Sequence, residues 1–233
     1  MLVTKPYKRE NAVNYARKFA FAQNPYFASF AGIGGNCTNF VSQSIFAGSC
    51  QMNYTPTFGW YFISLNERSP SWTGVEFFYN FITSNQGIGP FGREVGIDEL
   101  EIGDVIQLGR NEVGYYHTLL VVGFEGSDTL VAAQTDDAYG RPLSSYTNDY
   151  ARYIKIDGVR FETPDDYSCF DELYNVNPIP RPEPAPDAPE ESAPQQTPQS
   201  PEQETPGESS ERILLSPTRI QPSSSPSHLA LCY

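Results

Sequence analysis

The composition of the chain changes abruptly at Pro178, and this change limits the part of the chain that can fold. Thirteen of the twenty prolines lie in residues 178–233, and no aromatic residue occurs between Tyr174 and Tyr233. A segment so rich in Pro, Glu, Gln and Ser buries too little apolar surface to offset the entropy lost on ordering. We therefore predict a folded domain over 1–177 and a disordered acidic tail over 178–233, which is a candidate for binding a partner.

Within the predicted domain, a glycine-rich approach leads to a cysteine and then to an amphipathic run. Two glycines precede Asn36 and Cys37, and apolar residues follow at helical spacing. Asn36 or Thr38 can cap such a helix, which places Cys37 in its first turn. Unpaired N–H groups and the helix dipole favour negative charge there, which promotes the thiolate form of a cysteine. Cys37 is therefore a candidate nucleophile.

Three segments have the apolar periodicity of helices: residues 7–23, the run from Cys37 to a stop at Gly48, and residues 73–84. Short β-prone runs follow at 105–108, 116–124, 129–134 and 153–156, separated by segments of turn composition. Because helices come first and strands second, the predicted class is α+β, with N-terminal helices packed on an antiparallel β-sheet.

The choice of a partner for Cys37 is narrow, because the chain has two histidines and His228 lies in the predicted tail. His117 opens an apolar run of strand length. A cysteine at a helix start and a histidine at the start of a later strand is the arrangement of a papain-type thiol hydrolase. Each residue also has an ordinary structural interpretation, as a small buried side chain or as a core histidine.

The formal net charge of -13 argues against nucleic acid or an anionic membrane as a partner. No apolar run approaches the length of a membrane-spanning helix. The N-terminus lacks the apolar core of a signal peptide, so we expect a cytoplasmic protein, with non-classical export as the alternative. The sequence does not indicate an oligomeric state.

The cysteines lack metal-ligand spacing, and two histidines add little, so we expect neither a metal site nor a cofactor. A Cys37–Cys50 disulfide is the alternative that would leave no nucleophile. We interpret Cys50 and Cys169 as structural residues and Cys232 as an exposed thiol of the tail.

Several stretches resemble one known family. They are the residues from Tyr7 to Ala16, Asn24-Pro25, the run Cys-Thr-Asn-Phe-Val-Ser-Gln at 37–43, Gly-Asp-Val-Ile at 103–106, and His117-Thr118. In this order they resemble the putative amidase domain family, which is similar to the papain-like NlpC/P60 and CHAP groups. The resemblance covers roughly 7–156. It implies a papain-like fold and hydrolysis of amide or peptide bonds, with Cys37 as nucleophile, His117 as base and a peptide or peptidoglycan-like substrate.

The sequence departs from the family where a histidine tends to precede Thr in the strand after His117. Here the residues are Gln134-Thr135-Asp136. A Gln oxygen can accept a hydrogen bond from an imidazole and orient it, but it adds no charge. Asp136, which lies on the same side as Gln134 if the strand continues, is the alternative third group.

Four residues are candidates for lining a substrate groove: Asn36, Tyr26, Trp60 and Trp72. Aromatic clusters are more often part of a core, however. Four functions remain open: a cysteine hydrolase of amide bonds, an inactive relative that binds peptide, an adaptor that works through the Pro-rich tail, and a thiol acyltransferase.

Overall fold

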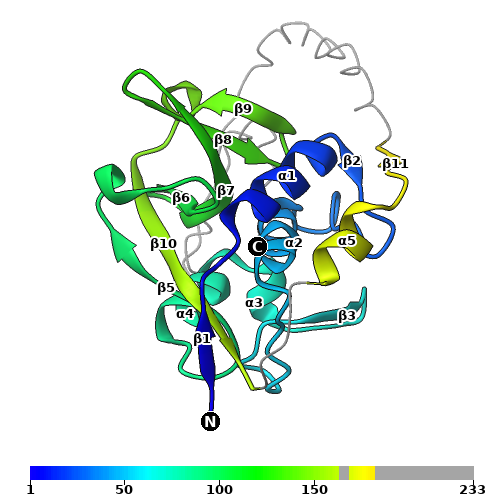
Figure 1. The fold of residues 1–233 in the computed structure, drawn as a ribbon. Coiled ribbons are helices and arrows are strands. Elements are labelled where there is room, and N and C mark those ends of the chain that lie inside the picture. Colours follow the sequence, from blue (N-terminus) through cyan, green and yellow to red (C-terminus); the bar gives the residue numbers. More distant parts are fainter. Residues whose placement is uncertain (163–167, 182–233) are drawn as a thin grey trace, which may run out of the picture. The chain divides into compact units, whose positions relative to one another are not determined.

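The computed structural model describes residues 1–162 and 168–181 (Figure 1). The helices are α1 (Arg9–Phe19), α2 (Cys37–Ser49), α3 (Pro70–Thr73), α4 (Val75–Ser84) and α5 (Cys169–Tyr174), with 3-10 turns at Ile97–Glu99 and Leu143–Ser145. The strands are β1 (Val3–Lys5), β2 (Ala22–Gln23), β3 (Phe62–Ser64), β4 (Glu67–Arg68), β5 (Gly89–Val95), β6 (Val105–Arg110), β7 (Gly114–Glu125), β8 (Asp128–Ala133), β9 (Ala138–Pro142), β10 (Tyr150–Phe161) and β11 (Ile179–Pro180).

Seven strands form one sheet in the order β1-β10-β6-β7-β8-β9, and β5 pairs with β10 outside this path. All its pairings are antiparallel. The first half of β10 pairs with β6, and its end pairs with β1. Two short ribbons, β3–β4 and β2–β11, lie outside this sheet. The predicted α+β class with an antiparallel sheet is confirmed.

The sheet has two buried faces, because successive residues of a strand point to opposite sides. On the side that we call the helix face, Leu120 and Ala132 belong to the same apolar core as Phe40 and Ile45 of α2. On the opposite side, the outer face, Leu119 belongs to a separate apolar cluster. Figure 1 shows α2 between the sheet and α5. The side chain of each strand residue near α2 therefore points either to the helix face or to the outer face.

Helix α2 is buried on almost every side, and Phe46 is the one residue of its thirteen that is partly exposed. Its polar side chains have partners, because Trp60, Trp72 and Tyr15 donate to the side chains of Ser42, Asn39 and Gln43. Buried polar groups are tolerated when they are paired in this way. The helix that carries Cys37 is thus fixed by packing and by hydrogen bonds.

The two ends of α2 differ from the sequence prediction. Asn36 occupies the N-cap position but makes no side-chain cap hydrogen bond. The helix runs past Gly48 to Cys50, the left-handed C-cap residue with a φ of 51°. Gly48 is instead required by close packing, because a Cβ atom there would lie 2.8 Å from the backbone oxygen of Lys8. The other two predicted helices are confirmed with shorter bounds, and Gly74, in an extended conformation, separates α3 from α4.

A buried ion pair ties α1 to the sheet. Arg9 Nη1 lies 2.6 Å from Asp104 Oδ1, and Asp104 is fully buried. Asp104 also accepts a hydrogen bond from the backbone N–H of Ile156 in β10. Burial raises the pKa of Asp104, and its hydrogen bonds and Arg9 oppose that rise. Asp104, which directly precedes β6, therefore links α1 and β10 to this part of the sheet.

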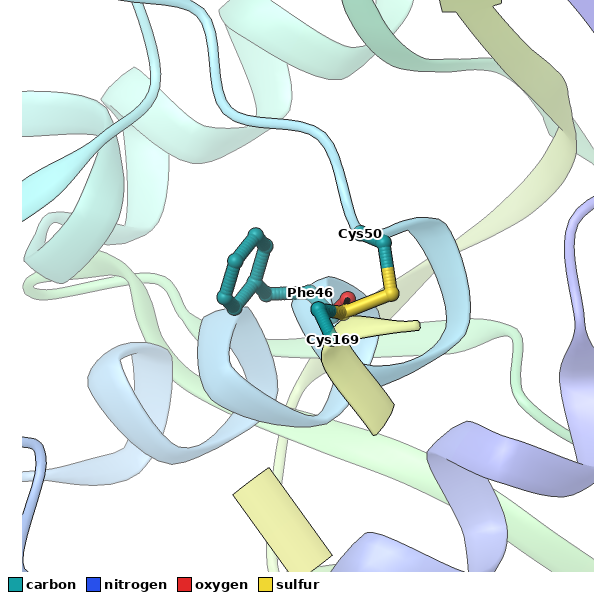
Figure 2. Close-up of a disulfide and its surroundings, with 3 residues drawn as sticks. All are labelled: Phe46, Cys50 and Cys169. Carbon is teal, nitrogen blue, oxygen red and sulfur yellow. Dashed lines mark hydrogen bonds between the residues drawn. A yellow bond between two sulfur atoms is a disulfide. The ribbon is translucent and has the colours of Figure 1, made fainter. Parts of the chain in front are cut away.

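A disulfide between Cys50 and Cys169 joins the end of α2 to the start of α5 (Figure 2). The Cα atoms of these residues lie 5.5 Å apart, within the usual range for a disulfide. This pairing rules out the Cys37–Cys50 alternative and agrees with a structural role for both residues.

The predicted tail falls mainly on residues 182–233, which lie outside the described part of the chain, as do Cys232 and His228. The residues 178–181 are described, and Ile179–Pro180 forms β11 and pairs with Ala22–Gln23. Of the helices in the described ranges, none is long and apolar enough to cross a membrane.

Candidate active site at the start of α2

Cys37 is the first residue of α2 and is completely buried. Its side chain packs with Val75 and with the partly buried Tyr115 of β7. Gly34 and Gly35, just before it, have φ values of 98° and 97°, a region that favours glycine. Cys37 is disulfide-bonded in the structure, so its thiolate would form only after reduction.

Gln134 lies beside the start of α2, on the helix face of the sheet. Its Oε1 accepts a hydrogen bond from Nδ2 of Asn36, the residue before Cys37. Its Nε2 donates to the backbone oxygens of Phe19, at 2.7 Å, and Ala22, at 3.0 Å. Both ends of the Gln134 amide therefore bind groups other than an imidazole. The Asn36 side chain is similarly committed, because its Oδ1 accepts hydrogen bonds from Phe30 N and Asn39 Nδ2.

A second set of hydrogen-bonded polar side chains lies on the helix face of the sheet, next to the start of α2. The hydroxyl oxygens of Thr38 and Thr118 lie 2.9 Å apart. Gln107 Nε2 donates to Thr118 Oγ1 at 3.2 Å and to the backbone oxygen of Val75 at 2.9 Å. Val75 is the residue that packs on Cys37. This network, which the sequence did not reveal, connects the start of α2 to β6, β7 and α4.

Arg152 places a buried positive charge at the far end of that network. Its Nε donates to Gln107 Oε1 at 2.7 Å, and its side chain is 6% exposed. The guanidinium carbon lies 3.7 Å from the ring centroid of Tyr79 and 3.8 Å from that of Tyr115. Nη2 lies 3.1 Å from a carboxylate oxygen of Glu76, close enough for an ion pair but not aligned as a hydrogen bond. Tyr115, whose ring contacts this guanidinium, also packs with Cys37, so one side chain separates the positive charge from the cysteine.

The imidazole of His117 points to the other face of the sheet. In the β6–β7 register Gln107 is opposite Thr118 and Leu108 is opposite His117. Since Thr118 contacts α2, its neighbour His117 must point to the outer face. There its ring lies 5.9 Å from that of Tyr146. The expected approach of His117 to the Cys37 sulfur is therefore not observed.

The environment of His117 favours its neutral form. Burial lowers its pKa to about 4, although the charge of Asp136 acts in the opposite direction. Its Nε2 atom is buried and has no hydrogen-bond partner among the described residues. An imidazole in this state is neutral at pH 7 and poorly suited to hold a proton during catalysis.

Asp136 does not share a face with Gln134. Strand β8 ends at Ala133, and Thr135 and Asp136 both have left-handed backbones, with φ values of 66° and 65°. The strand alternation on which the alternative third group depended therefore stops. The Asp136 carboxylate is largely exposed and forms an ion pair with Arg141 at 2.6 Å.

The aromatic residues expected to line a groove are mostly part of the core. Trp60 and Trp72 are fully buried, with ring centroids 4.7 Å apart, and both belong to the main apolar core. Tyr26 is half exposed. Within the described ranges, no group of three or more His, Cys, Asp and Glu residues could hold a metal ion.

Comparison with known proteins identifies the family. A family model described as "Putative amidase domain" matches residues 6–156. The chain belongs to this family. It is 35% identical over 136 residues to "Uncharacterized protein YhbB" of Bacillus subtilis (strain 168), which is 57% of this chain and 42% of that protein. The chain thus spans less than half of that relative. No solved structure matches.

The amidase-family domain contains three site residues that sequence reasoning missed: Gln107, Thr118 and Arg152. Gln107 and Thr118 lie within apolar strand runs, where an isolated polar residue signals either a buried partner or a site. Arg152 gave no such signal, because it precedes the predicted strand 153–156. Together these residues make the helix face under Cys37 polar and hydrogen-bonded.

Proposed function

We propose that this amidase-family domain binds peptides at the start of α2 and hydrolyses amide bonds only slowly, through Cys37. Membership of the family supports an amide ligand. We propose slow hydrolysis because the His117 ring points away from Cys37. The other histidine of the chain lies outside the described residues. This favours the peptide-binding alternative over an efficient Cys–His hydrolase.

The chemistry explains why an absent imidazole would matter. A Cys37 thiolate attacks the amide carbonyl carbon, and the carbonyl oxygen takes the negative charge, which N–H groups at a helix start can stabilise. The C–N bond then breaks only if the nitrogen receives a proton, because an amide anion is a poor leaving group. Without a proton donor, the intermediate expels the thiolate and returns to substrate. Water would complete hydrolysis of any acyl-enzyme that forms.

The substrate class remains that implied by the resemblance, peptides including peptidoglycan-like ones, and the fold would be papain-like. The Cys50–Cys169 disulfide bears on location, because disulfides persist in oxidising compartments. It supports the export alternative over a cytoplasmic protein. The adaptor hypothesis depends on the Pro-rich tail, most of which lies outside the described residues.

The proposal is tested by installing an imidazole on the Cys37 side. Gln134→His, in the reduced full-length protein, is expected to raise hydrolysis of a fluorogenic peptide amide about 100-fold, the lower end of the range of general acid–base catalysis. Gln134→Met is the matched control, because it disturbs the same hydrogen bonds without adding a titratable group. Fast turnover by the natural chain that is lost in His117→Gln would contradict the proposal and restore the Cys–His hydrolase.

A further inference from the structure

A cavity of about 310 Å³ lies between the β3–β4 ribbon and the short helices that follow it. Its lining residues are Arg68, Ser69, Pro70, Thr73, Gly74 and Phe77. Phe77 is 60% exposed, which is unusual for a large aromatic side chain on a helix. The cavity thus combines one positive charge with an accessible apolar wall, a combination typical of ligand pockets.

Arg68 has unused hydrogen-bonding capacity in this cavity. Its Nη1 donates to Leu65 O at 2.6 Å and its Nε donates to Thr73 Oγ1 at 3.3 Å. Nη2 has no acceptor, and no carboxylate pairs with Arg68, within the described ranges. The guanidinium also lies over the ring of Phe30, 4.3 Å from its centroid. It is therefore held in place while both N–H groups of Nη2 remain available.

The cavity adjoins the surroundings of Cys37 on two sides. Gly74, in its wall, is followed by Val75, which packs on Cys37. Phe30, under the guanidinium, donates its backbone N–H to the Asn36 side chain at 2.9 Å. A peptide bound at the start of α2 could therefore extend to Arg68 within a few residues.

Within the described ranges Arg68 forms no ion pair, although the chain has a net charge of -13. Glu67, its acidic neighbour, is exposed, and no ion pair joins it to Arg68 within the described ranges. A guanidinium binds carboxylates by charge-assisted hydrogen bonds, which are stronger than neutral ones.

We infer that this cavity is a subsite for a carboxylate group of a peptide bound at Cys37, and that Arg68 recognises that group. Acidic peptides are then the preferred ligands of the domain. The inference rests on the proposed peptide binding, but it concerns residues outside the Cys37 network.

The test compares two capped peptides, Ac-Ala-Glu-Ala-NH₂ and Ac-Ala-Gln-Ala-NH₂, in NMR titrations of the full-length Cys37→Ala protein, which cannot turn them over. The Glu peptide is expected to bind about ten-fold more tightly, the typical effect of one charge-assisted hydrogen bond. Arg68→Gln should abolish the preference, and Arg68→Lys should retain part of it. Arg110→Gln is the matched control, because Arg110 also forms no ion pair with the described residues but lies at the end of β6.

Equal affinity for the two peptides, or a preference that survives Arg68→Gln, would overturn the inference while leaving peptide binding intact. A third probe, N-acetylglutamate, separates the two proposals. If it binds in an Arg68-dependent way and neither peptide binds, the proposed function fails and the carboxylate subsite stands for free carboxylates. Absence of binding by all three probes would overturn both. Melting temperatures of the variants establish that each is folded.

Discussion

On the helix face of the sheet, the buried side chains of Gln107, Thr118 and Gln134 are hydrogen-bonded, whereas on the outer face His117 Nε2 and the Tyr146 hydroxyl have no hydrogen-bond partner among the described residues. An unpaired buried polar atom costs roughly 1–3 kcal/mol, and a paired one contributes about 1 kcal/mol. The helix face is therefore organised to hold Cys37 rigidly, and the outer face carries an imidazole at a cost in stability. A single step along β7, from His117 to Thr118, separates these two environments.

The largest expected difference between the two faces is in amide hydrolysis. With Cys37 reduced, Cys37→Ala is expected to remove residual amide hydrolysis, a loss of at least about 100-fold, because the nucleophile is gone. His117→Gln should leave the rate within about twofold, since the ring points away from Cys37. Peptide-amide hydrolysis by the purified full-length proteins measures both. Similar losses of hydrolytic activity in the two variants would mean that His117, on the outer face, takes part in the reaction at Cys37.

The pH dependence of stability sharpens the description of the outer face. The pKa of His117 is lowered to about 4, below the usual 6.5, so the unfolded chain takes up a proton that the folded protein rejects. Its contribution is fully present above pH 6.5 and is lost as the pH falls towards 4, amounting to about 3 kcal/mol. Urea unfolding of the natural protein and of His117→Gln between pH 7 and 4 should differ by this amount. Parallel curves would show that the imidazole is accessible.

Arg152 tests whether the helix-face network is structural. Arg152→Ala removes the partner of Gln107 and the cation between two tyrosine rings, and is expected to cost about 2 kcal/mol. The exposed carboxylate of Glu76 adds little to this. Arg110→Ala, on a more exposed arginine that also lies over a tyrosine ring, should cost less than about 1 kcal/mol. Free energies of unfolding in urea give both values, and equal costs would contradict the network.

The smallest expected effect compares one hydroxyl from each face. Thr118→Val keeps the side-chain shape but leaves Thr38 and Gln107 short of a partner, and should cost about 1 kcal/mol. Tyr146→Phe removes a hydroxyl that makes no hydrogen bond with the described residues, so stability should stay unchanged or rise. Melting temperatures suffice for this pair. A larger loss in Tyr146→Phe than in Thr118→Val would reverse the assignment of the faces.

The helices and the main strands could be predicted because periodicity and turn residues mark them. Strand β5, by contrast, begins in a segment rich in glycine and proline, a composition that does not predict a strand. It forms because β10 offers a long edge, a tertiary effect that local sequence does not report. The α+β class could be predicted from the order of the elements. Strand β5 could not, because it forms by pairing with β10.

The position of Cys37 could be predicted, but the orientation of His117 could not. The strand that follows His117 is apolar at almost every position, since both faces of the sheet are buried, so no alternation indicates which face a residue occupies. The irregular register between Leu108 and Gly109 adds to this ambiguity. Asp136 was misplaced because the left-handed turn at Thr135 has no glycine to signal it.

The Cys50–Cys169 disulfide makes residues 50–169 a covalently closed ring, with α1 and α2 on one arm outside it. Strands β3 to β10 all lie within the ring. A single backbone cut anywhere in the ring therefore opens the circle without dividing the molecule, whereas a cut between α1 and Cys37 releases α1 from the rest of the chain. Topologically, strands β3 to β10 tolerate one break that α1 does not.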